Sequence, residues 1–501
     1  MDESGGEESR MTCTKKGAFF FLCLSAIFSF NVEAKRYIVR YKNNESGGRV
    51  SALSKRAQRS IVHLTKKSEV DAIKKQSDVA YIEEDIYLHA NYEPGDSNGT
   101  VDPRYDEQWH YGNVNGLNLP LAWDLSTGLT SQVVAVVDTG FTDHSELSGR
   151  IASSADMIDD ATLGRDGNGR DNDGHDPGDY NTGFESCSGG SMKNSSWHGT
   201  HVLGTIGANA ENGVGVVGVN WKAKLVAVRV LGPCGGWLSD IADGIRWAAG
   251  GTVAGVSNNP YPAKVINLSL GGPGACSNTL QEAIDYARSQ KSVVVVAAGN
   301  DGNNMDYYPY QPSTCRGVIT VGATDSGGVK AYYSNYGKAV DVWAPGGTSF
   351  QGVLSLGNSG SQGPMTEIYK TMAGTSMASP HVSGVASLIL AVNPDLYPNQ
   401  VEGALRESSL ANGVLDARDA IDIAMSMTPD PNYTVPEFST GTTPVSTAPT
   451  PIFTSDDNGG ACGSVIDVSG GSSGGGPGQF MVTLAIGLML IVIPKKSFKK
   501  N

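Results

Sequence analysis

Five short runs of almost uninterrupted apolar residues constrain the fold of this 501-residue chain more than any other feature. They are V-V-A-V-V at 133–137, L-V-A-V-R-V at 225–230, V-I-N-L-S-L at 265–270, V-V-V-V-A-A at 293–298 and V-I-T-V-G-A at 318–323. Runs without polar alternation predict strands that are covered on both faces. Helical patterns, such as residues 279–290, lie between several of them. We therefore expect an α/β domain with a mainly parallel sheet flanked by helices.

The N-terminus has the pattern of a secretory signal. Two lysines at 15–16 precede the apolar run G-A-F-F-F-L-C-L-S-A-I-F-S-F at 17–30. V-E-A at 32–34 then places small residues where a signal peptidase cleaves. We expect residues 1–34 to be a signal peptide, and a retained signal anchor is the alternative.

Residues 35–92 read as a small α+β unit of their own. K-R-Y-I-V-R-Y at 35–41 alternates as a strand does, and a basic, polar stretch of helical character follows. A second strand pattern occupies 78–90, before the turn-rich linker N-Y-E-P-G-D-S-N-G-T at 91–100. The larger α/β domain is expected over 93–428.

The composition changes beyond the α/β domain. Residues 429–479 are rich in Pro, Thr, Ser and Gly and predict a flexible stalk. The run F-M-V-T-L-A-I-G-L-M-L-I-V-I-P at 480–494 is apolar, and K-K-S-F-K-K-N closes the chain. We expect a membrane anchor here, although a helix of this length, about 22 Å, is short against a ~30 Å hydrocarbon core. A glycolipid-attachment signal is the alternative, because small residues lie at 472–474.

Charge and cysteine content bound the partners and the compartment. A formal net charge of −14 argues against nucleic acid as the main partner. Of the seven cysteines, two lie in the predicted signal and Cys462 lies in the predicted stalk. The other four suggest two disulfides in an oxidising compartment, with three connectivities possible: Cys187, Cys234, Cys276 and Cys315.

Four polar residues stand where catalytic groups of open α/β sheets form. Asp138 ends the first apolar run in V-V-D-T-G, and Asn300 follows another in A-A-G-N. His198 opens a predicted helix in S-S-W-H-G-T-H, and Ser376 lies in G-T-S-M-A-S-P-H. A serine nucleophile needs a base, the base needs an orienting carboxylate, and an amide can donate to a developing oxyanion.

Each of these motifs has an ordinary structural explanation when it is taken alone. D-T-G also makes turns, and H-x-x-H at His198 and His201 lacks the glutamate and the spacing of the usual zinc helix. Three serines at 376, 379 and 383 also suit a small-residue helix start. Only the combination is specific.

The combination resembles the subtilisin-like serine peptidases, whose triad runs in the order Asp, His, Ser. The similarity rests on V-V-D-T-G, H-G-T-H-V-L-G-T, N-L-S-L-G-G, A-A-G-N and G-T-S-M-A-S-P-H-V-S-G, and covers nearly all of 101–428. It implies that Ser376 is the nucleophile and that His198 is the general base. It also implies that Asp138 orients the imidazole and that Asn300 shares the oxyanion hole with the Ser376 N–H.

The resemblance assigns roles to other parts of the chain as well. Ser379 and Ser383 are left to helix packing, and His201 to a structural role. Residues 35–92 look like the inhibitor prodomain of the family, which the enzyme cuts off itself, here between His89 and Glu93.

Extended substrate is expected to bind between two backbone edges. The residues implied are Ser269, Leu270, Gly271, Gly235 and Gly236 at the edges, and Ala297, Ala298 and Gly299 around the pocket for the residue before the scissile bond. These walls are small and apolar, without a carboxylate, which favours apolar or aromatic residues over paired basic ones.

Resemblance to secreted members of the family, bacterial extracellular ones included, implies the pairs Cys187–Cys234 and Cys276–Cys315.

Related enzymes also bind structural Ca²⁺. Spaced acidic residues in D-G-N-G-R-D-N-D-G-H-D-P-G-D at 166–179 suit a hard cation, although a solvated acidic loop is the alternative. The candidate ligands are Asp166, Asp171, Asp173 and Asp176, with a second set of Asp102, Glu146 and Asn212. No organic cofactor is expected.

We therefore expect a secreted or surface-held serine endopeptidase that is made as an inhibited precursor and acts on protein substrates. N-x-[ST] sequons at 44, 98, 194, 267 and 432 indicate a glycoprotein, except that Asn267 lies in a predicted buried strand. A catalytically inactive binding protein of the same fold and a processing protease of narrow specificity are the alternatives.

Overall fold

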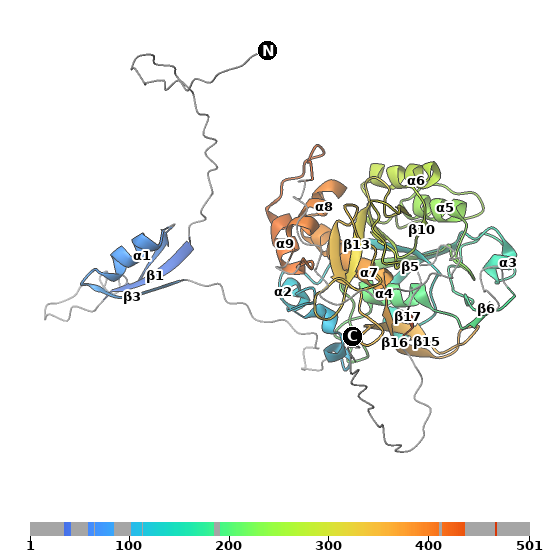
Figure 1. The fold of residues 1–501 in the computed structure, drawn as a ribbon, viewed down its shortest axis with the longest axis horizontal. Helices are drawn as coiled ribbons and strands as arrows, with labels where there is room; N and C mark the ends of the chain where they lie inside the picture. Colours follow the sequence, from blue (N-terminus) through green and yellow to red (C-terminus); the bar gives the residue numbers. More distant parts are fainter. Residues whose placement is uncertain are drawn as a thin grey trace, which may run out of the picture. The chain divides into compact units, whose positions relative to one another are not determined.

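The computed structural model describes residues 35–41, 59–64, 66–84, 102–112, 114–184, 191–409, 413–435 and 466–467 (Figure 1). The predicted signal peptide, the predicted anchor and nearly all of the predicted stalk lie outside these residues. The chain divides into two compact units, one within residues 1–89 and one within 90–501, and each is described by itself.

The first unit is a three-stranded antiparallel sheet with one helix. β1 (Lys35–Tyr41) lies in the centre and pairs with β2 (Arg59–Leu64) and β3 (Val79–Glu84). The helix is α1 (Lys67–Lys74). Alternation along the strands buries one face, so the small core consists of Val39, Val70, Val79 and Ile82. This is the α+β arrangement that the strand patterns at both ends predicted.

The second unit is built on a seven-stranded sheet in which every paired strand is parallel to its neighbour. In spatial order the strands are β14 (Val342–Pro345), β13 (Ile319–Thr324), β11 (Val293–Ala297), β9 (Val265–Leu268), β4 (Val133–Asp138), β8 (Lys224–Arg229) and β5 (Ile151–Asp156). The prediction of a mainly parallel sheet is confirmed. All five predicted strands occur in it, and the two that sequence reasoning missed are the edge strands β14 and β5.

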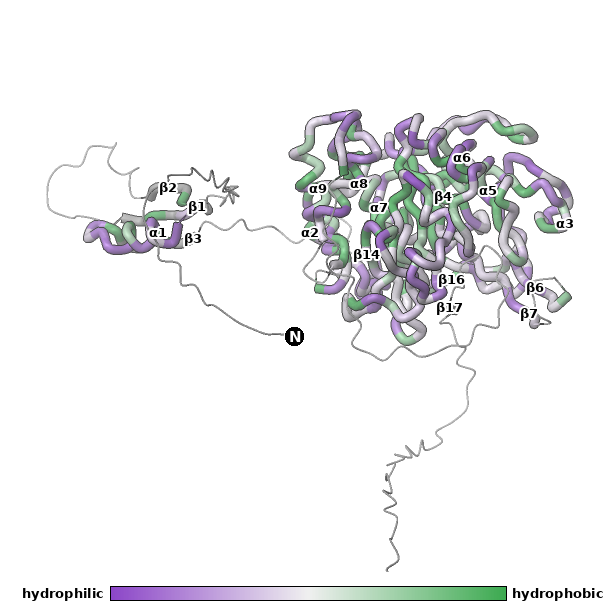
Figure 2. Tube along the Cα trace, turned by 45° about the horizontal axis from the view of Figure 1, so that its top comes forward, coloured by the Kyte–Doolittle hydropathy of each residue, from purple (hydrophilic) through white to green (hydrophobic). Residues whose placement is uncertain are grey.

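Helices cover both faces of this sheet. On β4, Val134 and Val136 face a core shared with α4 (His198–Gly207) and α7 (Thr375–Val392). Val133, Ala135 and Val137 face the other core, shared with α5 (Leu238–Ala248) and α6 (Asn278–Ser289). Hydrophobic segments accordingly gather around the strands and α7 in the interior of this unit (Figure 2). Burial on both faces explains why the strand sequences are apolar without alternation.

Shorter elements surround this core. The helices are η2 (Tyr105–Glu107), η3 (Trp109–Tyr111), α2 (Leu119–Trp123), η4 (Ser145–Leu147), α3 (Ala161–Gly164), α8 (Pro398–Glu407) and α9 (Ala417–Ser426). The strands are β6 (Asn181–Thr182), β7 (Met192–Lys193), β10 (Gly272–Pro273), β12 (Tyr310–Gln311), β15 (Val353–Asn358), β16 (Glu367–Ala373) and β17 (Ile466–Asp467).

Among the described residues, α7 is the one helix long and apolar enough to span a membrane, but 89% of it is buried inside the unit. It is therefore the central core helix of this domain. The predicted anchor at 480–494 lies outside the described residues and stays a prediction.

Candidate active site

The carboxyl ends of β4 and β11 lie at one edge of the sheet, because both strands run parallel to the β9 strand between them. Asp138 is the last residue of β4, and Asn300 follows β11. The N-termini of α4 and α7 supply His198 and Ser376, and these two helices pack against each other. The fold thus positions the four predicted residues on four separate elements of one domain.

Asp138 and His198 form a buried pair. Nδ1 of His198 lies 2.7 Å from Oδ1 of Asp138, and the same oxygen accepts the N–H of Thr139, also at 2.7 Å. Burial by itself lowers the pKa of His198, but the charge and hydrogen bond of Asp138, together with the charges of Asp179 and Asp176, raise the pKa above its usual 6.5. Nε2 of His198 has no hydrogen-bond partner among the described residues. That nitrogen is the one that can accept a proton from a nucleophile.

Ser376 is the second residue of α7. Its hydroxyl donates to the carbonyl of Ser269 at 3.1 Å, so in this structure it is turned to the substrate edge and not engaged with the imidazole. The first N–H groups of a helix lack intrahelical acceptors, so the Ser376 N–H belongs to a set that can bind an anion.

Asn300 is held against the start of α7. Its Oδ1 accepts both the N–H and the hydroxyl of Thr375, at 2.8 and 2.9 Å. A Cβ added to Gly374 would lie 3.4 Å from Nδ2 of Asn300, so the amide nitrogen also lies beside the helix N-terminus. Because Oδ1 is fixed by two donors, the orientation of the amide is fixed as well.

Ser379 and Ser383 have more definite contacts than the helix packing that was predicted for them. Both hydroxyls donate to Oδ1 of Asn267, at 2.8 and 2.9 Å. Nδ2 of Asn267 donates to Ser269 Oγ, which in turn donates to the carbonyl of Ser376. The fully buried Asn267 therefore connects α7 to β9, and its burial removes its sequon from solvent.

His201 is enclosed on the second turn of α4. Nε2 lies 3.1 Å from the carbonyls of both Val353 and Lys370. Burial lowers the pKa of His201 to about 3. These contacts match the structural role expected for it.

The predicted substrate-pocket residues surround an aromatic ring that sequence reasoning missed. A Cβ added to Gly271 would lie 2.6 Å from the ring of Tyr310, and one added to Gly299 would lie 2.7 Å from it. Ala297 and Ala298 are buried nearby, and Tyr310 itself is buried. The glycines at 271 and 299 are therefore required for the ring to fit. The sequence spacing gave no signal for Tyr310, because it lies ten residues beyond Asn300, in the two-residue strand β12.

The second predicted substrate edge is a glycine turn. Gly235 has a φ of 101°, a conformation that side chains other than glycine rarely adopt. A Cβ added to Gly236 would lie 2.0 Å from the carbonyl of Val230. Both glycines are thus demanded by the backbone path at this edge.

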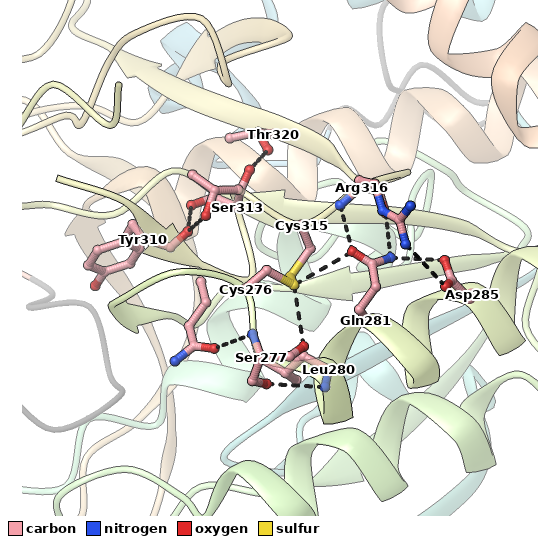
Figure 3. The surroundings of a disulfide bond; sticks show 12 residues. Cys276, Ser277, Leu280, Gln281, Asp285, Tyr310, Ser313, Cys315, Arg316 and Thr320 are labelled. Carbon is pink, nitrogen blue, oxygen red and sulfur yellow. Dashed lines mark hydrogen bonds and ion pairs between the residues drawn. A yellow bond between two sulfur atoms is a disulfide. The ribbon is translucent and has the colours of Figure 1, made fainter. Parts of the chain in front are cut away.

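The Cys276–Cys315 disulfide is present, as predicted, and links the segment before α6 to the loop before β13 (Figure 3). Cys234 is disulfide-bonded as well. Cys187 lies outside the described residues, so the predicted Cys187–Cys234 pair stays a prediction.

The four loop aspartates predicted to bind calcium do not converge. Among the described residues, no three Asp, Glu, His or Cys side chains form a group that could hold a metal ion. Asp166 lies 2.8 Å from the Arg229 guanidinium, and Oδ1 of Asp173 lies 2.5 Å from Nδ1 of His175. Asp171 accepts from the Asn168 amide, and Asp176 is buried apart. The guanidinium of Arg229, at the end of β8, lies in this loop. It provides a positive charge beside Asp166, where the sequence pattern predicted a bound Ca²⁺.

The second predicted set does come together. Asp102 accepts the backbone N–H groups of residues 211, 212 and 213 at 2.9 to 3.1 Å. Nδ2 of Asn212 donates to Oε2 of Glu146 at 3.0 Å. Both carboxylates are buried, and burial, with a contribution from the Asp102 charge, raises the pKa of Glu146 to about 7. The two buried carboxylates are oxygen donors of the kind that Ca²⁺ takes. Asn212 turns its amide nitrogen toward Glu146 while its Oδ1 accepts the N–H of Val214, so calcium at this set stays a prediction.

A cavity of about 300 Å³ lies beside the disulfide and was not anticipated. It is lined by Ser313, Thr314, Cys315, Gly317, Val318, Thr320, Ala339, Asp341 and Glu402. Burial raises the pKa of Asp341 to about 7, and Arg406 lies 3.5 Å from its Oδ1. The lining residues come from separate segments of the chain, so no single sequence motif predicts this cavity.

A parallel sheet that brings an Asp–His pair to the N-terminus of a serine-bearing helix defines the subtilisin-like class of fold. Comparison with known proteins gives the family. The Subtilase family, Peptidase_S8, matches residues 130–432, and the chain belongs to it.

Relatives are similar over the same region. An "Extracellular protease" of Xanthomonas campestris pv. campestris is 49% identical over 335 residues, 66% of this chain and 56% of the relative. An "Extracellular basic protease" of Dichelobacter nodosus is 43% identical over 359 residues, 69% of this chain and 57% of the relative. The chain therefore spans little more than half the length of these relatives.

Among solved structures, a protease from Pseudoalteromonas arctica is 49% identical and superposes with a TM-score of 0.62. The match covers 65% of this chain and 99% of that one. The subtilisin-like fold predicted from sequence is confirmed.

Proposed function

We propose that this protein is a serine endopeptidase of the secretory pathway, with Ser376, His198 and Asp138 as its triad. One observation carries the proposal. His198 is buried, its Nδ1 is bonded to Asp138, and its Nε2 is left without a partner among the described residues. In the part of the chain that the structure describes, His110 and His201 also have one buried ring nitrogen without a partner, but neither is bonded to a carboxylate. A general base needs one nitrogen oriented by a carboxylate and the other open, and of these three histidines only His198 has that arrangement.

In the acylation step, Ser376 Oγ attacks the substrate carbonyl while its proton passes to Nε2 of His198. The hydroxyl first leaves the Ser269 carbonyl by rotation about its Cα–Cβ bond. Asp138 stabilises the imidazolium that forms. The oxyanion receives hydrogen bonds from the Ser376 N–H and Asn300 Nδ2, and the helix N-terminus adds a favourable dipole.

Collapse of the tetrahedral intermediate releases the amine, which takes its proton from Nε2 of His198. Water then attacks the acyl group on Ser376 with His198 again as the base, and the acid product leaves. These two half-reactions use the same four protein groups and restore the free serine.

The substrate pocket favours apolar or aromatic residues before the cut, with broad preference. Support comes from the apolar surroundings at Ala297 and Ala298 and from the ring of Tyr310 beside Gly271 and Gly299. An aromatic wall contacts apolar side chains well and offers no countercharge to a basic one.

Residues 35–92 act as an inhibitory prodomain that the enzyme removes itself. The described part of this segment is an independent three-stranded sheet with its own small core, which is compatible with a detachable inhibitor. The expected cut between His89 and Glu93 lies outside the described residues.

Secretion is supported by the disulfides and by the relatives named as extracellular proteases. Residues 1–34 would direct export and 480–494 would anchor the product, with Ca²⁺ stabilising the domain at Asp102, Glu146 and Asn212. If the anchor exists, truncation after Gln479 releases activity into the medium. Equal release of full-length enzyme contradicts the anchor.

Ser376→Ala tests the proposal. The variant should not react with an active-site fluorophosphonate and should keep residues 35–92, because loss of the serine lowers kcat by roughly 10⁶-fold. Ser379→Ala is the matched control on the same helix: it loses one bond to Asn267 but should still be labelled and processed. Normal labelling of Ser376→Ala contradicts the assigned nucleophile, and unlabelled wild type favours an inactive binding protein.

A further inference from the structure

The residue before His198 is held in a backbone conformation that its bulky side chain does not favour, and hydrogen bonds fix the segment 195–197 around it. Trp197 has φ 58° and ψ 35°, the left-handed region that bulky residues rarely adopt. Its side chain is buried, and its indole N–H donates to the carbonyl of Gly360 at 2.8 Å. Ser195 is bonded through its N–H to the carbonyl of Ser361 at 2.9 Å. Such a conformation persists only where the surroundings fix it.

Ser196 connects this segment to an aspartate from a distant loop. Its hydroxyl donates to Oδ2 of Asp179 at 2.7 Å, and its N–H donates to Oδ1 at 2.6 Å. The same hydroxyl oxygen accepts the N–H of His198 at 3.2 Å. The two carboxylate oxygens of Asp179 therefore both bind Ser196. Ser196 precedes the N-cap residue Trp197, and its hydroxyl binds the backbone N–H of the residue that carries the imidazole.

The loop that carries Asp179 is itself fixed to the end of β4. The N–H of Phe141 donates to the carbonyl of Gly174 at 3.1 Å, and the N–H of Asp176 donates to the carbonyl of Phe141 at 2.8 Å. A Cβ added to Gly178 would lie 2.0 Å from the carbonyl of Gln362. Because the loop is bonded to the turn after Asp138 and approaches residue 362 closely, Asp179 has a defined position relative to the Asp–His pair.

We propose that Asp179 is a positioning residue for His198, which it holds in register with Asp138 through Ser196. The inference rests on the proposed function, since it concerns the same histidine. Asp179 touches neither the imidazole nor the expected substrate edges in the hydrogen bonds described. We therefore expect Asp179 to affect the position of the His198 imidazole during proton transfer and, through its negative charge, the pKa of that imidazole.

The titratable groups that face His198 come from three elements. Asp138 ends β4, Asp176 and Asp179 lie on the loop, and His201 follows on α4 itself. Burial, with a contribution from the Asp179 charge, raises the pKa of Asp176 to about 8, and burial keeps His201 neutral. Asp138 is the strongest of the three carboxylates in raising the pKa of His198, and Asp179 and Asp176 add to it. Removal of the Asp179 charge should therefore lower the pKa of the imidazole without abolishing its pairing.

Asp179→Asn and Ser196→Ala separate the two contributions. Each variant is expressed as the full-length chain and is processed by added wild-type enzyme. Its active sites are counted by titration with a fluorophosphonate, and rates are given per active site. Thermal unfolding is recorded for each variant. Asp179→Asn should lower kcat between about 10- and 100-fold with little change in KM, since misplacement of the base affects the chemical step. It should also move the acid limb of kcat/KM to lower pH, by a few tenths to about one unit.

Ser196→Ala keeps the Asp179 charge, so it should lower kcat without moving the acid limb downward. The double variant should be about as slow as the slower single variant, because both changes break one connection. Asp143→Asn is the matched control: it removes one charge from a side chain that is 95% exposed and should change neither kcat nor the pH profile.

Three outcomes overturn the inference: an Asp179→Asn enzyme with wild-type kcat and pH profile, a double variant whose losses multiply, or losses that Asp143→Asn reproduces. Should Asp179→Asn not fold, Ser196→Ala and Asp179→Glu decide it, since the longer carboxylate should restore the pH profile better than it restores kcat. Inactive wild type refutes the proposed function instead, while active wild type with inactive Ser376→Ala leaves only this inference in question.

Discussion

Nδ1 of His198 lies 2.7 Å from Oδ1 of Asp138, although sixty residues separate them in sequence. Asp138 is fully buried at the end of a parallel strand, and His198 is the first residue of a helix packed on that sheet. The contact fixes which ring nitrogen carries the proton and leaves Nε2 open. Both the pH dependence of the reaction and the transfer of the serine proton are therefore expected to depend on this pair.

The pH dependence of kcat/KM should report His198 in the free enzyme. Burial alone would lower its pKa, but the charge and hydrogen bond of Asp138, together with the charges of Asp179 and Asp176, raise the pKa above 6.5. Below that pKa the ring is protonated and cannot accept the proton of Ser376, so activity should fall as pH drops through an apparent pKa above 6.5. A midpoint near that of an ordinary carboxyl group would show that another residue limits the reaction.

Asp138→Asn should lower kcat by about 10⁴-fold while the protein remains folded, because an amide no longer enforces the productive tautomer. The acid limb of the small remaining activity should move to lower pH, since the raising charge is gone. Steady-state kinetics and circular dichroism check both points. Asp106→Asn, an exposed change of equal charge, is the control and should behave as wild type.

Asn300→Ala should lower kcat by about 10²- to 10³-fold with KM nearly unchanged, because the lost donor acts on an oxyanion that exists only in the transition state. Comparison of kcat and KM on one peptide substrate measures this. The exposed Asn303, three residues along, offers a matched Asn→Ala control with wild-type kcat expected. A rise in KM alone would instead place Asn300 in ground-state binding.

Calcium should stabilise the domain through Glu146 and Asp102. A ligand that binds only the native state adds about 2.7 kcal/mol at a hundredfold excess over its Kd. A chelator should therefore shorten the half-life of wild type at elevated temperature, and Glu146→Gln should respond far less. Asp173→Asn, in the loop whose aspartates do not converge, should respond as wild type does. Equal chelator sensitivity of wild type and Glu146→Gln would exclude this set.

Much of the site could be predicted because its residues stand next to strong local patterns. Asp138 ends one apolar strand and Asn300 follows another, and strands that are apolar on both faces indicate a parallel sheet covered by helices. The edge strand β5, I-A-S-S-A-D, was missed because it is only partly covered and its sequence is correspondingly polar. The calcium prediction for the acidic loop stays a prediction, and sequence spacing does not reveal that Arg229 enters this loop from another strand and pairs with Asp166.

The sequence by itself determined the class of fold and the four candidate catalytic residues. Apolar runs indicate strands buried on both faces, and the order of the short motifs can be read directly from the chain. Only the tertiary structure decided the contacts between segments: Tyr310 against Gly271 and Gly299, Asn267 bonded to α7, and Asp179 bound to Ser196. Each of these contacts joins segments that only the fold brings together. Their partners lie far apart in sequence, so no local periodicity or propensity encodes them.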